Sequence, residues 1–118
     1  MAESIRDPKK LRADVDEFQR LQRQMQMLGM QKQQMQMQIE EMKLAQEALK
    51  DAKGEIYKAV GNLLVEAEKG KTKKELEGRI ETFEVRRGTI AKQEEKMREK
   101  LDSLRKELEK ATAAAGSS

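Results

Sequence analysis

A seven-residue repeat of apolar side chains runs through two long segments of this chain, one on each side of its midpoint. The apolar positions are spaced alternately by three and four residues, which places them on one narrow stripe of a helix. The first stripe comprises Leu11, Phe18, Leu21, Met25, Leu28, Met35, Ile39, Met42 and Leu49. The second comprises Leu76, Ile80, Phe83, Ile90, Met97, Leu101, Leu104, Leu108 and Ala111. The repeat therefore predicts two helices that pack along a coiled-coil seam.

The composition supports a seam rather than a compact core. Of the 118 residues, 40% are charged and 36% hydrophobic, and the aromatic residues are one Tyr and two Phe. A chain this polar is either disordered or a coiled coil, and the apolar repeat decides for the coiled coil. The absence of His and Cys excludes thiol and imidazole catalysis and the usual zinc ligands. With no phosphate-binding loop either, the sequence predicts no enzyme, no metal and no cofactor.

The lack of long apolar runs and of a signal peptide predicts a soluble, intracellular protein, and we expect it in the cytoplasm. No run of apolar residues is long enough to cross a bilayer, and the first ten residues lack the apolar core of a signal peptide. The 25 basic and 22 acidic residues are interspersed, which is typical of a solvated helix surface. We therefore expect neither a membrane nor a nucleic acid as a partner.

Local signals predict where the helices begin and end. Asp7-Pro8 favours a helix start, and Gly54 favours a stop. Thr72 and Glu75 fit a capping box, so the second helix is expected from about Lys73. The predicted organisation is one domain over residues 1–118, with helices at about 8–53 and 73–113 and a β-hairpin at about 55–68.

Polar residues interrupt both stripes at Lys32, Gln46, Arg87 and Glu94. Isolated polar residues in a seam commonly fix its register at some cost in stability. Counting outward from the chain's midpoint places Lys32 and Glu94 at nearly the same height. A register-setting contact between them is therefore a hypothesis.

The stretch from Glu55 to Glu68 predicts the hairpin. Two short runs rich in β-formers flank Gly61-Asn62, and a two-residue loop with Gly first suits a tight primed turn. The loop predicts pairing of Val60 with Leu63, Ala59 with Leu64, Lys58 with Val65 and Tyr57 with Glu66. Both faces are then apolar near the turn, and an isolated hairpin is marginal in water. The hairpin should therefore pair with other chains; folding back onto its own helices is the alternative.

The helix ends that hold the two termini carry apolar residues with little beyond each other to pack against. They are Leu11, Val15, Phe18, Leu21, Leu104 and Leu108. Frayed ends of this kind would offer an adaptable surface to unfolded chains. An ordinary closed coiled-coil end is the alternative.

The first helix is rich in Gln and Met, and Met27, Met30 and Met37 lie off its stripe. The Gln residues suit the outer face of a helix better than a prion-like tract. Flexible thioethers are suited to surfaces that accept many partners. Simple helix filling explains the off-stripe methionines equally well.

From Tyr57 to Val65 and through the helix containing Thr89-Ile90 and 92–97, the sequence resembles the β subunit of archaeal prefoldin. The resemblance covers nearly the whole chain, and its most specific part is the Tyr57-Lys58-Ala59-Val60-Gly61 run. The length, the single hairpin between two long helices and the Gln-rich first helix agree with it.

The resemblance implies a hexamer with prefoldin α subunits, two α and four β, in which the hairpins join an intersubunit β-barrel. The fold class is then mainly α, a long antiparallel coiled coil with one central β-hairpin. It also implies an ATP-independent chaperone that holds unfolded clients at its coiled-coil tips and delivers them to a group II chaperonin. The assembly residues would be Ile56, Tyr57, Val60, Leu63, Leu64 and Val65.

Other functional classes predict different behaviour. A coiled-coil tether or scaffold would dimerise through its seam and have no client activity. The interpretation as a nucleic-acid-binding protein rests on the small basic excess alone. Such a protein would bind nucleic acid with a steep dependence on salt.

Overall fold

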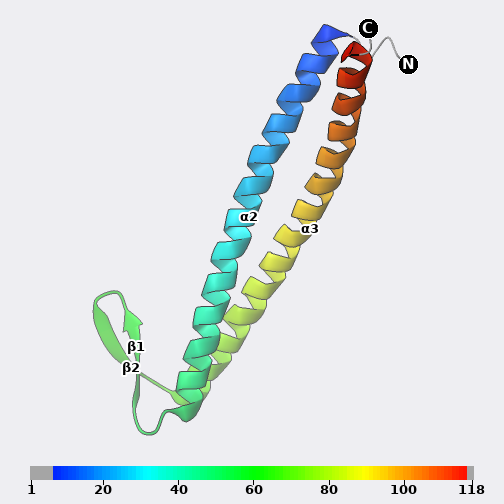
Figure 1. The fold of residues 1–118 in the computed structure, drawn as a ribbon. Coiled ribbons are helices and arrows are strands. Elements are labelled where there is room, and N and C mark those ends of the chain that lie inside the picture. The colour runs from blue at the N-terminus through cyan, green and yellow to red at the C-terminus, as the bar shows by residue number, and fades with distance from the viewer. Residues whose placement is uncertain (1–6, 117–118) are drawn as a thin grey trace. The chain divides into compact units, whose positions relative to one another are not determined.

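The computed structural model describes residues 7–116 and contains two long helices and one β-hairpin (Figure 1). In chain order the elements are α2 (Pro8–Asp51), β1 (Ile56–Val60), β2 (Leu63–Ala67) and α3 (Lys69–Gly116). The two helices are antiparallel, and the predicted fold of a helix pair with a central hairpin is confirmed. The chain divides into two compact units, one of residues up to 31 and from 90, the other of residues 32–89.

Helix α2 begins where the cap signal predicts. The backbone N–H of Lys9 donates to Asp7 Oδ1 at 3.0 Å, and the N–H of Leu11 donates to the Asp7 carbonyl at 2.9 Å. Asp7 therefore satisfies amides of the first turn, and Pro8 occupies the position where a missing N–H costs nothing. At its other end α2 stops at Asp51, and Gly54 turns the chain with a φ of 88°.

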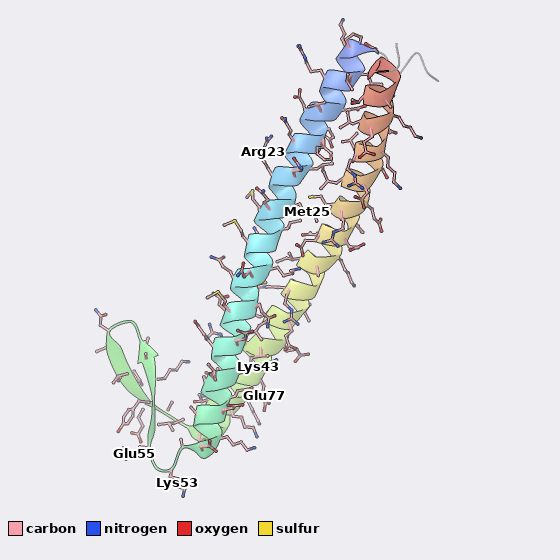
Figure 2. All side chains as sticks on the ribbon, viewed as in Figure 1. Arg23, Met25, Lys43, Lys53, Glu55 and Glu77 are labelled. Carbon is pink, nitrogen blue, oxygen red and sulfur yellow. The ribbon has the colours of Figure 1, made fainter. Side chains whose placement is uncertain are left out.

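In the unit of residues up to 31 and from 90, the predicted stripe residues lie against the opposite helix. Figure 2 shows the Met25 side chain on the side of α2 that faces α3, and Arg23 on the other side. Leu11 is the exposed member of the stripe in this unit. Glu94 is buried, with 8% of its surface exposed, and its carboxylate lies against Gly29.

In the unit of residues 32–89, the seam is apolar with polar contacts along its sides. Ile39 is fully buried, and Leu49 and Ile80 are nearly so. Arg87, predicted as a polar interruption, is half-buried and donates from Nη1 to Gln36 Oε1. Lys43 Nζ lies 3.4 Å from Glu84 Oε1. Lys32 is also half-buried, and its predicted role in the register remains a hypothesis.

Helix α3 begins at Lys69, so the predicted start at about Lys73 and the capping box at Thr72 are wrong. The N–H of Thr72 donates to the Glu68 carbonyl at 2.9 Å, which is the first bond of the helix. Thr72 therefore lies inside the first turn. The helix also continues to Gly116, beyond the predicted end at about residue 113.

The hairpin has the predicted register and turn. Its strands pair antiparallel, from Ile56 with Ala67 at the base to Val60 with Leu63 at the turn. Gly61 has a φ of 61°, and Asn62 does not adopt positive φ. Positive φ at the first loop residue only is the pattern of a type II′ turn, which a Gly-first loop favours.

Candidate assembly site at the β-hairpin

Both faces of the hairpin present apolar side chains to solvent. Because side chains alternate along a strand, Val60, Leu63 and Val65 lie on one face, and Tyr57 and Leu64 lie on the other. All five are exposed, and Leu64 has 75% of its surface accessible. Ile56, the sixth predicted assembly residue, is half-buried at the base. The structure therefore brings the six residues together on one small element.

The sheet also leaves backbone groups without strand partners. Within residues 7–116 it has two strands, so each strand has one unpaired edge. Exposed edges and exposed apolar faces together suit the addition of strands from another chain.

Two contacts link the elements around the base of the hairpin. Lys58 Nζ, on β1, lies 3.1 Å from Glu75 Oε2 on α3. Lys69 Nζ donates to the carbonyl of Ala52 at 2.9 Å and to that of Lys50 at 3.4 Å. A cation at the carbonyl end of α2 is favourable because of the helix dipole. Sequence reasoning missed both contacts, since their partners are 17 to 19 residues apart and no periodic pattern links them.

A groove of about 510 Å³ separates β1 from the adjoining helix turns. Small side chains line much of it, because α2 contributes Ala45 and Ala48, the turn after α2 contributes Ala52, and β1 contributes Ala59. The small residues leave the inner face of the hairpin partly open.

The single tyrosine, Tyr57, also lines this groove. The Tyr57 hydroxyl donates to Glu55 Oε2 at 2.7 Å. That hydrogen bond, with a smaller effect of desolvation, raises the pKa of Tyr57 above its ordinary value. The stabilisation that it gives is complete below the ordinary tyrosine pKa and is lost as the pH rises through the raised value.

Replacing the carboxylate acceptor by a neutral amide should lower this pKa. In the isolated chain, Glu55→Gln is expected to move the pKa of Tyr57 down toward its ordinary value near 10, as measured by ultraviolet absorbance of tyrosinate. Glu66→Gln is the matched control, because Glu66 lies opposite Tyr57 in the register but is not its hydrogen-bond partner. An equal shift in both variants would contradict the assigned contact.

The predicted client-binding residues lie at the helix ends and differ in exposure. Leu11 and Val15 have 37% and 38% of their surfaces exposed. Leu21 is buried, and Phe18, Leu104 and Leu108 are half-buried. A bound segment would reach Leu11 and Val15 directly but would reach Leu21 only after the helix ends separate.

Neither helix of the described chain is long and apolar enough to span a membrane. Across residues 7–116, no cluster of three or more acidic side chains is arranged to hold a metal ion.

Comparison with known proteins assigns this architecture to one class. A family model described as "Prefoldin subunit" matches residues 12–115. The crystal structure of the prefoldin beta subunit from Thermococcus strain KS-1 superposes with a TM-score of 0.81 at 33% identity, covering 90% of this chain and 94% of that one. The chain belongs to the prefoldin subunit family, whose members are not enzymes.

Within that family the similarity is to β subunits of archaea. The prefoldin subunit beta of Methanococcus aeolicus is 45% identical over 56 residues, and that of Thermococcus onnurineus is 43% identical over 56 residues. Each alignment spans about half of this chain and about half of the relative. The chain is thus a member of the prefoldin β-subunit group.

Proposed function

We propose that this chain is a chaperone subunit that assembles through its hairpin with α-type prefoldin subunits. The complex has two α and four β subunits and lies in the cytoplasm. It holds unfolded proteins without nucleotide and delivers them to a group II chaperonin. Holding of this kind relies on several weak apolar contacts, each of which stays reversible.

The observation that carries the proposal is the exposed hairpin with apolar residues on both faces. A two-stranded sheet of this size is not stable alone in water, so its apolar faces require partners. Assembly brings several helix pairs into one particle, and the weak contacts of each pair then act together on one client.

Removing the exposed apolar side chains at the helix ends should remove most of the client holding. The double variant Leu11→Ser and Val15→Ser is expected to assemble normally but to lose most suppression of aggregation of a thermally unfolded client. The physical reason is that both side chains are available to a client without separation of the helices. Light scattering of client and chaperone mixtures measures the effect.

Met30→Ser with Met37→Ser is the matched control, because both methionines are exposed on α2 away from its ends. Full retention of activity in the Leu11 and Val15 variant would contradict the tip assignment. If the complex of the unaltered chain forms but never suppresses aggregation, the result would instead support a structural scaffold as the function.

A further inference from the structure

A second apolar groove lies in the unit of residues up to 31 and from 90. It has a volume of about 460 Å³. Its lining residues follow spacings of three and four on both helices, over 24–31 on α2 and 93–100 on α3. Each helix therefore contributes one face, about 10 Å long at 1.5 Å per residue.

Three apolar and adaptable side chains line this groove among Gln and Lys residues. The seam residues Leu28 and Met97 form part of the lining, and both are half-buried. Met27 borders them with 61% of its surface exposed. Thioether side chains are flexible and polarizable, so they fit apolar partners of varied shape.

The groove is cationic on one side and neutral on the other. Lys96 and Lys100 of α3 line it, and no carboxylate does. On α2, residues 24–31 carry no charged side chain. Neither lysine belongs to any of the ion pairs identified among residues 7–116. Both charges therefore point to a partner with negative charge beside its apolar side chains.

We propose that this groove binds an amphipathic segment of a non-native polypeptide whose apolar side chains are flanked by Asp or Glu. The proposal rests on the proposed chaperone function and names the chemistry of the client segment. Apolar side chains of the segment contact Met27, Leu28 and Met97, and its carboxylates lie near Lys96 and Lys100. The helix ends bind segments through apolar contact alone. The groove adds a preference for segments that also carry Asp or Glu.

A peptide titration tests where the segment binds. The probe is a short synthetic peptide with leucines three and four residues apart and glutamates between them, added to the full chain with ¹³C-labelled methionine methyl groups. Signals of Met27 and Met97 are expected to shift and saturate, while those of Met30 and Met37 stay in place. Met30 and Met37 are internal controls, because they are exposed on α2 but do not line the groove. Equal shifts of all four, or none, would overturn the proposal.

Charge reversal tests the chemistry of the partner. Lys96→Glu with Lys100→Glu is expected to weaken binding of the same peptide about tenfold, because attraction becomes repulsion at two exposed positions. Lys92→Glu is the matched control, since Lys92 is exposed on α3 and does not line the groove. Helix content by circular dichroism verifies that each variant is folded. Equal binding of a peptide with lysines in place of the glutamates would refute the inference.

The two proposals fail differently. If the charge-reversed complex holds every client as well as the natural one, the groove has no role and the chaperone function stands. If neither complex suppresses aggregation while both assemble, the proposed function fails, and the methionine signals decide separately whether the groove binds the peptide. If the chain without peptide has a mass greater than that of one copy, and the charge reversal restores the mass of one copy, the groove binds a second copy. That result would overturn the proposal.

Discussion

Replacing Leu64 with aspartate is expected to abolish assembly with an α-type subunit while both helices stay folded. Leu64 is the most exposed large apolar residue of the hairpin, and its burial between subunits would contribute about 1.5–3 kcal/mol. An aspartate in its place would carry an unpaired charge into that interface at a cost of several kcal/mol. Because every β subunit carries the same change, the interface is destabilised at each of these subunits in the assembly.

The mass of the mixture with an α-type subunit, measured by multi-angle light scattering, decides the outcome. Leu44→Asp is the matched control, because Leu44 lies on α2 with 66% of its surface exposed and is not part of the hairpin. The control is expected to form a complex of full size. A complex of full size with Leu64→Asp would show that the hairpin does not mediate assembly.

The seam and the hairpin were predictable because each depends on a short-range pattern. A seven-residue repeat fixes which side of a helix is apolar, so the buried positions of Leu21, Ile39, Leu49 and Ile80 followed from spacing alone. The register of the hairpin followed from its two-residue loop, since the loop length determines which residues face each other.

The start of α3 was not predictable in the same way. Thr72 and Glu75 form a plausible capping box, but the chain is already helical at Lys69. The helix begins one turn earlier than the cap signal predicts, at Lys69, whose Nζ donates to the carbonyls of Lys50 and Ala52. Glu68 accepts the first helical hydrogen bond through its backbone carbonyl, which no side-chain signal reveals.

The contacts around the hairpin base could not be predicted from the sequence, and neither could the second groove. Lys58 with Glu75, and Lys69 with the carbonyl end of α2, depend on how the strands leave the helices. The spacing places Met27 off the stripe but does not show that it borders a groove with Lys96 and Lys100. Near the two termini, the spacing places both Leu11 and Leu21 on the stripe but does not show that Leu11 is exposed.

Truncating Ile39 to alanine is expected to destabilise the helix pair by about 2–5 kcal/mol, because the side chain is 0% exposed and its removal leaves a cavity in the seam. The melting temperature should fall by roughly 10–30 °C. Circular dichroism at fixed protein concentration measures this change, since assembly would itself raise the apparent stability. A coiled coil has a single line of buried side chains, so neighbouring contacts cannot compensate for one that is lost.

Leu44→Ala provides the control for that loss. It also removes aliphatic carbons from α2, but from an exposed side chain, and should change stability by no more than about 0.5 kcal/mol. Equal destabilisation by the two variants would contradict the assigned seam. Below its melting temperature, Ile39→Ala should still assemble with an α-type subunit because its hairpin is intact, whereas Leu64→Asp should melt normally and fail to assemble. These opposite outcomes would separate the residues that stabilise the helix pair from those that join subunits.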